Sequence, residues 1–215
     1  MPTITKITEQ KRSANRRSVY LDGSFAFGCN VNVVAKFRLR EGLQLTAEQL
    51  EQILQGEVRQ DCFDSAVRSL ESRLHSRSEL KTKLMRKEWG VAVIDGVLDD
   101  LQRMGYIDDA RFAKTRALSA AQHKHHGKRR AMVELLRKGV NREVAKTALN
   151  DVYDATDTTA VARQLVQKQL PRLKKLDVQT ARRRIVGMLQ RRGFDYDDIG
   201  PVVNEALGEL RDDSL

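Results

Sequence analysis

Three pairs of basic residues recur at one position in this sequence, and they are the side chains best suited to bind an anion. They are Arg86-Lys87, Arg137-Lys138 and Arg191-Arg192. Arginine and lysine donate charge-assisted hydrogen bonds to phosphate and carboxylate oxygens. Cations in the last turn of a helix also stabilise its dipole by about 0.3–1 kcal/mol, so a structural role stays open for each pair. Three pairs in register would line one surface and suit phosphates or an acidic groove of a protein.

Two further basic clusters lie upstream of the second and third pairs. We expect each cluster to open a helix, where cations oppose the helix dipole, so a surface binding role explains them better than helix stability does. With the pairs, they complete the candidate set for a partner or DNA: Arg86, Lys87, Lys124, Lys128, Arg129, Arg130, Arg137, Lys138, Arg182, Arg183, Arg184, Arg191 and Arg192.

Other residues that could do chemistry favour structural roles. His123, His125 and His126 fall in a loop, but no carboxylate or cysteine has a suitable ligand spacing, so we expect no metal site. Cys29 and Cys62 read as buried apolar fillers. Asp108 stands where a helix cap is wanted. The sequence holds no phosphate-binding glycine loop, nucleophile elbow, zinc-protease helix or dinucleotide fingerprint, so we expect neither an enzyme nor a bound cofactor.

The charge balance supports a polyanionic partner. The 215 residues contain 39 Lys and Arg against 29 Asp and Glu, a net charge of +10. The segment 109–155 carries +6, whereas 1–60, 61–108 and 156–215 carry +3, −1 and +2. No apolar run approaches the roughly 18 residues of a membrane span, and no secretory signal is visible. With two lone cysteines, these features predict a cytoplasmic protein that does not contact a membrane.

The first 45 residues differ from the rest. They contain the alternating segment ITKITEQ and two apolar runs that flank Asp22-Gly23, a favoured hairpin turn. A short helix should follow and end near Arg40. Thr46 then caps a connecting helix over 46–60. We interpret residues 1–45 as a β-rich module.

An internal repeat organises the remaining sequence. The segments LKTKLMRKEWGVAVIDGVL (80–98), AMVELLRKGVNREVAKTAL (131–149) and IVGMLQRRGFDYDDIGPVV (185–203) align without gaps. Each predicts a helix that ends in a basic pair, an apolar residue that pins the turn (Trp89, Val140 or Phe194), and a second helix. In the second and third segments a glycine follows the pair, as at many helix ends. Another helix lies upstream of each, near 62–74, 109–122 and 157–170, which gives three-helix units at 61–108, 109–155 and 156–215.

The predicted fold is therefore mainly α, with three tandem three-helix repeats in an elongated arrangement after the β-rich module. Residues 61–207 resemble the bacterial RecX family, through SRSELKTKLMRKEWG, VLDDLQRMGYIDDARFAKTRA, ELLRKGV and MLQRRGFDYDDI. The segment SVYLDGSFAFGCNVNVVAKFRLREGLQL resembles the β-hairpin extension of some members. The first repeat departs from the family where Glu88-Trp89 replace a Lys-Gly type ending.

The resemblance implies a regulator of the RecA recombinase in recombination, DNA repair and the SOS response, and not an enzyme. Such proteins bind in the groove of the RecA filament on single-stranded DNA. They limit its extension, ATPase and strand exchange, and they tend to be monomers. The residues alone leave two alternatives open: a direct helix-turn-helix-like DNA-binding regulator, and a helical-repeat RNA-binding adaptor.

Overall fold

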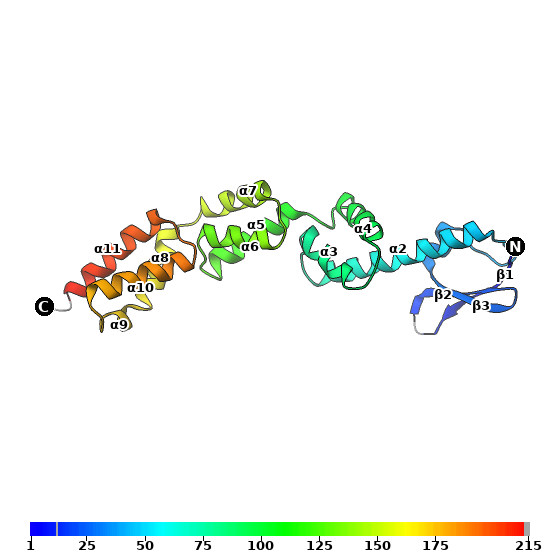
Figure 1. The fold of residues 1–215 in the computed structure, drawn as a ribbon, viewed down its shortest axis with the longest axis horizontal. Coiled ribbons are helices and arrows are strands. Elements are labelled where there is room, and N and C mark those ends of the chain that lie inside the picture. Colours follow the sequence, from blue (N-terminus) through cyan, green and yellow to red (C-terminus); the bar gives the residue numbers. More distant parts are fainter. Residues whose placement is uncertain (12, 213–215) are drawn as a thin grey trace. The chain divides into compact units, whose positions relative to one another are not determined.

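The computed structural model describes residues 1–11 and 13–212, which fall into two compact units (Figure 1). The first unit comprises Met1–His75 and Leu80–Ile107. The second comprises Ser76–Glu79 and the chain from Asp108 onward. Within the described residues, no helix is both long enough and apolar enough to cross a membrane.

The N-terminal module is a three-stranded antiparallel sheet whose strands follow chain order: β1 (Ile4–Gln10), β2 (Ser13–Leu21) and β3 (Ser24–Asn30). The predicted hairpin is confirmed. Asp22 and Gly23 have φ values of 49° and 87°, and both must be positive in the tight turn that matches strand twist. The inner face of the sheet buries Ile4, Val19 and Cys29 completely.

Helix α1 (Val31–Lys36) is shorter than predicted, because the chain reverses before Arg40. Arg38 adopts a left-handed φ of 51°. This conformation lets the Leu39 amide donate to the Val34 carbonyl at 2.9 Å, and it buries the Leu39 side chain in the core of the module. The helix therefore ends in a Schellman-type turn with arginine where glycine is usual.

Helix α2 (Ala47–Ser72) replaces two predicted helices, over 46–60 and 62–74, with one continuous helix. Thr46 and Gln49 form the predicted capping box. The two helices merge because α2 serves two cores. Ile53 packs into the core of the N-terminal module, whereas Cys62 and Ala66 pack into the core of the first repeat.

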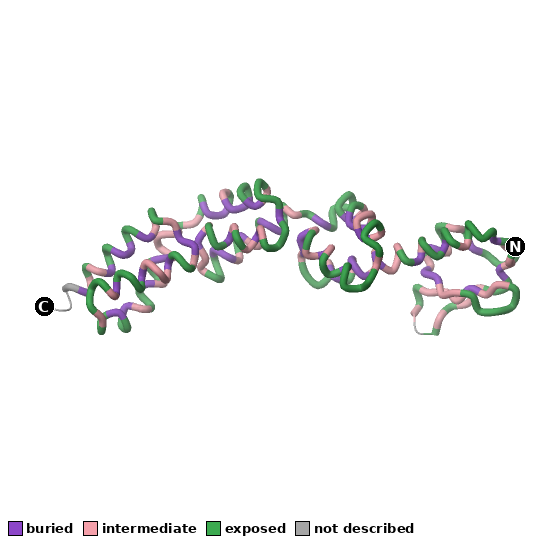
Figure 2. Tube along the Cα trace, in the orientation of Figure 1, coloured by how far each residue is buried: buried purple, intermediate pink, exposed green. Residues whose placement is uncertain are grey.

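Three helical repeats follow the β module, so the predicted fold class is confirmed. The first repeat comprises the later part of α2 with α3 (Arg77–Met85) and α4 (Val91–Arg103). The second comprises α5 (Asp109–Gln122), α6 (Lys128–Arg137) and α7 (Arg142–Tyr153). The third comprises α8 (Thr158–Gln167), a short α9 (Leu170–Leu173), α10 (Val178–Arg191) and α11 (Tyr196–Asp212). Buried positions recur along the helices of each repeat (Figure 2).

The third repeat differs from its prediction where its first helix ends. The helix expected over 157–170 ends at Gln167, and α9 begins separately with Pro171 in its first turn, where proline lacks no needed hydrogen bond. Pro201 lies inside α11. Ile199, Val202 and Val203 of that helix are buried in the repeat's core, which holds it in place.

Candidate functional site

The basic pairs lie where the middle helix of each repeat ends, that is, after α3, α6 and α10. Each middle helix closes in a turn whose third residue has a left-handed backbone, with φ of 63° at Glu88, 72° at Gly139 and 82° at Gly193. In the second and third repeats the amide of the residue after the glycine donates a hydrogen bond to the carbonyl of the leucine four residues before the glycine, at 3.2 Å in both. We call residues 86–88, 137–139 and 191–193 the closing turns. Glutamate at position 88 thus occupies the same turn as the two glycines.

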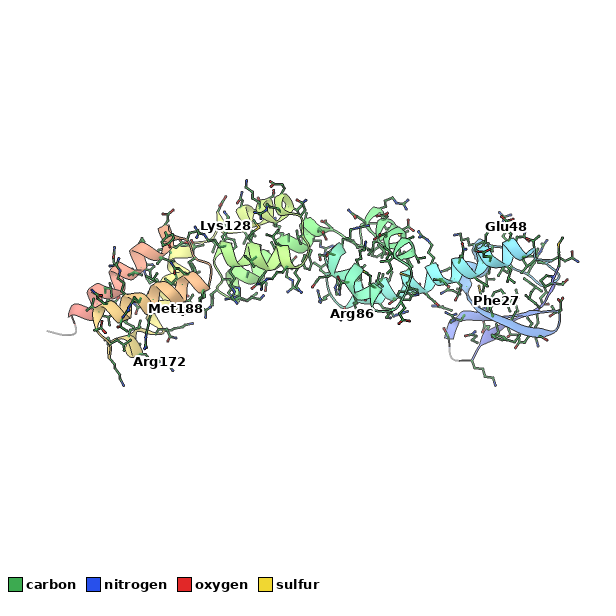
Figure 3. All side chains as sticks on the ribbon, in the orientation of Figure 1. Phe27, Glu48, Arg86, Lys128, Arg172 and Met188 are labelled. Atoms are coloured by element: carbon green, nitrogen blue, oxygen red, sulfur yellow. The ribbon has the colours of Figure 1, made fainter. Side chains whose placement is uncertain are left out.

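The first member of each pair points into solvent. Arg86, Arg137 and Arg191 are exposed, and within the described residues their side chains form no hydrogen bond or ion pair. Figure 3 shows the Arg86 side chain at the end of α3. These arginines keep their hydrogen-bond donors available for a partner.

The second member of each pair is bound within the protein. Lys87 Nζ donates to Ser65 Oγ at 2.9 Å and lies 5.5 Å from the centre of the half-buried Trp89 ring. Lys138 Nζ lies 2.6 Å from Glu79 Oε1. Arg192 donates to a backbone carbonyl at 3.3 Å. The structure therefore separates each predicted pair into one free and one occupied cation.

The closing turns also join neighbouring repeats within the second unit. The Gly127 amide donates to the Arg192 carbonyl at 2.8 Å, and the Arg129 amide donates to the Gly193 carbonyl at 3.2 Å. At the equivalent place one repeat earlier, Ser76 Oγ donates to the Lys138 carbonyl at 2.5 Å. The last carbonyls of a helix have no partner within it. Here the start of the preceding middle helix supplies one.

The cations around the start of α6 are paired within the protein, and Arg129 and Arg130 also contribute to the contacts between repeats. These cations face acidic side chains: Lys124 and Arg130 face Glu134 at 3.1 and 3.6 Å, Lys128 faces Asp154 at 3.4 Å, and Arg129 faces Asp195. Arg130 also donates to the Arg191 carbonyl at 3.0 Å. Lys128 is labelled in Figure 3. Acidic partners and helix-end carbonyls thus offset charges that the helix dipole disfavours, and binding by these four residues stays a prediction.

The arginines at 182–184 do not open a helix, contrary to prediction. Helix α10 begins at Val178, where the Asp177 carboxylate caps the Thr180 amide at 2.9 Å. The three arginines therefore lie in its second turn, all exposed. Arg183 donates to the Thr180 hydroxyl at 3.1 Å. The sequence prediction placed the start of this helix at the basic run and overlooked Asp177, although aspartate is a favoured helix cap.

Arg182 and Arg183 line a shallow groove between α10 and α11 that sequence reasoning missed. Tyr196 also lines the groove, and its side chain is 66% exposed. Its hydroxyl accepts from Gln190 at 3.1 Å. The spacing of the repeat columns gave no signal for Tyr196, because the residues aligned with it are Val91 and Arg142. The groove combines an aromatic ring with cations, a combination that also occurs in single-strand nucleic-acid sites.

The histidine loop is structural in its local contacts. His126 Nδ1 lies 3.1 Å from Glu134 Oε1, and the Tyr153 hydroxyl donates to the His126 carbonyl at 2.6 Å. Burial lowers the pKa of His126, and nearby cations lower it further. The described residues contain no cluster of three His, Cys, Asp or Glu side chains that could hold a metal ion. Asp108 caps α5 as predicted, accepting from the Arg111 amide at 2.9 Å.

Comparison with known proteins assigns the chain to a family. Sequence models of the RecX N-terminal domain and of the first, second and third RecX three-helix domains match residues 2–46, 62–101, 108–149 and 156–203. Regulatory protein RecX of Bacillus subtilis is 32% identical over the full chain and 81% of its own length. Regulatory protein RecX of Clostridioides difficile is 30% identical over 96% of the chain and 97% of its own length.

Two solved structures show the same fold. A crystal structure of regulatory protein RecX matches with a TM-score of 0.82 and 21% identity, covering 95% of this chain and 100% of that one. A crystal structure of RecX from Lactobacillus salivarius matches with a TM-score of 0.64 and 21% identity, covering 70% of this chain and 97% of that one. The domain matches follow the β module and the three repeats in order. The chain therefore belongs to the RecX family of regulatory proteins.

Proposed function

We propose that this protein modulates the RecA recombinase, mainly as a negative regulator. It binds as a monomer in the groove of the cytoplasmic RecA–single-stranded DNA filament and limits filament extension, ATP hydrolysis and strand exchange. The family supports a regulatory role. The proposal assigns the protein no catalytic step and no cofactor.

One observation carries the proposal. Arg86, Arg137 and Arg191 are exposed at the same position of three equivalent closing turns, and their donors are free within the described residues. A periodic partner offers carboxylates or phosphates at repeated positions. A repeated arginine can form bidentate hydrogen bonds with either group. Arg182 and Arg184 are also exposed and extend the free cations of the third repeat.

The helix-turn-helix alternative is less compatible with the last helix of each repeat. A recognition helix contacts bases with residues near its N-terminus. Helix α11 begins with Asp197 and Asp198 in its first turn, and α4 has no cation before Arg103 in its last turn. Carboxylates at a helix start would repel DNA phosphates. Of these three helices, only α7 has a cation in its first turn, at Arg142.

The test is ATP hydrolysis by RecA on single-stranded DNA with increasing amounts of this protein. We expect inhibition at substoichiometric amounts. The double variant Arg137→Glu/Arg191→Glu should inhibit about tenfold less well or worse, with a weaker salt dependence, because it places negative charge where anions should bind. The control Arg142→Glu/Lys168→Glu makes the same charge change at exposed positions outside the closing turns and should inhibit normally.

The outcomes separate the alternatives. Equal inhibition by wild type and the closing-turn variant would reject the role of these arginines. No inhibition by wild type would reject the modulator itself. Sequence-specific duplex binding without recombinase would favour the DNA-binding regulator, and RNA-selective binding would favour the adaptor.

A further inference from the structure

A hollow of about 190 Å³ opens between α5 and α6 of the second repeat. Ala120, Ala131 and Leu135 form its apolar floor. All three residues are buried. For comparison, an apolar cavity of roughly 150 Å³ in another protein holds a benzene-sized molecule. The hollow thus has room for one aliphatic side chain from outside.

The hollow lies beside a repeat column whose side chain changes size. That column holds Leu80 in the first repeat, Ala131 in the second and Ile185 in the third. Leu80 and Ile185 are fully buried and fill the core of their own repeats. Alanine lacks three of the side-chain carbons that leucine or isoleucine supplies here. At this column the second repeat therefore supplies less side-chain volume than the other two repeats do.

The rim of the hollow is basic. Its charged residues are four cations, Arg116, Lys124, Arg137 and Lys138, and one carboxylate, Glu134. Lys124 already neutralises that carboxylate at 3.1 Å, and Lys138 is paired with Glu79 at 2.6 Å, which leaves Arg116 and Arg137 as the cations available to a partner. Arg137 has no side-chain hydrogen bond or ion pair among the described residues. Arg116 lies 5.4 Å from the centre of the Phe112 ring, an interaction that does not consume its hydrogen-bond donors.

We propose that this hollow binds one aliphatic side chain of an acidic segment of the recombinase. The inference rests on the proposed function and specifies one of its contacts. The basic rim complements an acidic segment, and the alanine floor complements an aliphatic group. A nucleobase fits less well, because no aromatic side chain lines the hollow and bases bind single-strand sites mainly by stacking on aromatic rings. Arg137 then contacts protein, whereas the cations beside Tyr196 remain available for DNA.

The first test fills the hollow with the residue of the first repeat. The variant Ala131→Leu should weaken binding to the RecA filament between about tenfold and a hundredfold, because the partner's side chain can no longer be buried there. The control Val133→Leu adds a carbon on the same helix, at a residue that does not line the hollow and is 46% exposed. It should bind like wild type. Affinity is measured by fluorescence anisotropy of a labelled protein titrated with filament.

A second test fills the hollow after folding, so that the added volume cannot interfere with folding itself. The variant Ala131→Cys is allowed to fold and is then treated with methyl methanethiosulfonate, which attaches a methylthio group to an accessible thiol. Cys29 and Cys62 should not react, because both are completely buried and burial raises the pKa of each thiol. Treatment should weaken filament binding about tenfold or more, and a reductant should restore it. Treated wild type is the control.

Each result has one interpretation. Unchanged affinity after filling would overturn the hollow as a binding site, and so would failure of the introduced thiol to react. If filling weakened binding to bare single-stranded DNA equally, the occupant would be nucleic acid and the acidic segment would be rejected. Failure of the wild-type protein to bind the filament would instead reject the proposed function.

Discussion

The backbone amide of Gly127 donates a hydrogen bond to the carbonyl of Arg192 at 2.8 Å, which joins the start of one middle helix to the end of the next. The contact is so close that a Cβ atom on Gly127 would lie 2.1 Å from the carbonyl oxygen of Gly193. Neighbouring repeats of the second unit are thus coupled by main-chain contacts that side-chain chemistry alone would not reveal.

We expect Gly127→Ala to reduce the free energy of unfolding by about 1–3 kcal/mol, because the methyl group meets backbone that cannot move aside like a side chain. Equilibrium urea unfolding followed by circular dichroism measures the change. Gly200→Ala is the matched control, since nothing lies within 4 Å of a Cβ there and the residue is inside α11. The control should be neutral or stabilising by up to about 1 kcal/mol. Equal effects of the two substitutions would contradict the account of the joint.

The two members of a basic pair should have separable effects. Arg191→Ala should leave the free energy of unfolding within about 0.5 kcal/mol of wild type, as expected for an exposed residue without partners, while weakening filament binding. Lys138→Ala removes the ion pair with Glu79, whose side chain is only 12% exposed, and should cost up to about 1 kcal/mol. Urea unfolding and filament anisotropy on the same samples check both. The assignment fails if Arg191→Ala destabilises the protein more than Lys138→Ala does.

The histidine loop should make stability depend on pH in one window. Burial first, and then Arg130, Lys124 and Arg192, lower the pKa of His126 below its ordinary 6.5, while Glu134 acts in the opposite direction. The unfolded chain therefore binds this proton more readily than the folded chain. Stability contributed by the neutral imidazole is complete well above pH 6.5 and is lost as pH falls from 6.5 through the lowered pKa. Unfolding free energies at several pH values between 5 and 8 should fall less steeply for His126→Gln than for wild type. Parallel curves would exclude His126 as the source.

Backbone strain at the glutamate of the first closing turn should lower the free energy of unfolding measurably. Position 88 has a φ of 63°, a conformation that costs a residue with a Cβ about 1 kcal/mol relative to glycine. Glu88→Gly should therefore raise the free energy of unfolding by about that amount. Glu88→Gln removes the charge but keeps the Cβ and should change stability little. A stabilising Gln substitution would show that the charge and not the backbone was at fault.

Much of the fold could be predicted, because local rules decide it. The hairpin at Asp22-Gly23 needs only residues that tolerate positive φ, and the caps at Thr46 and Asp108 need only a side-chain oxygen before a helix. The repeat could be found because Leu84, Leu135 and Leu189 are buried at equal places in similar units.

The differences arise where distant contacts decide the local structure. Helix α2 continues through residue 60 because two cores share it, and the start of α10 was missed because Asp177 caps ahead of the basic run. For the candidate site, the sequence identifies the cations but does not tell which are paired within the protein and which are free. Arg129 and Arg137 look alike in sequence, yet the fold places only Arg129 against an aspartate.

The neighbours of the closing turns explain why the first turn has glutamate where the other two have glycine. A Cβ on Gly139 or Gly193 would lie 2.2 Å from Ser78 or 2.3 Å from Arg130, both in the first turn of the preceding repeat's middle helix. Glycine at these places makes room for a neighbour as well as permitting the backbone angle. The first repeat follows the β module and has no earlier three-helix unit to accommodate, so glutamate is tolerated at position 88. The residue at this position thus differs between the first repeat of the series and the repeats that follow another one. Further copies of the second repeat could be inserted only if they kept their glycine.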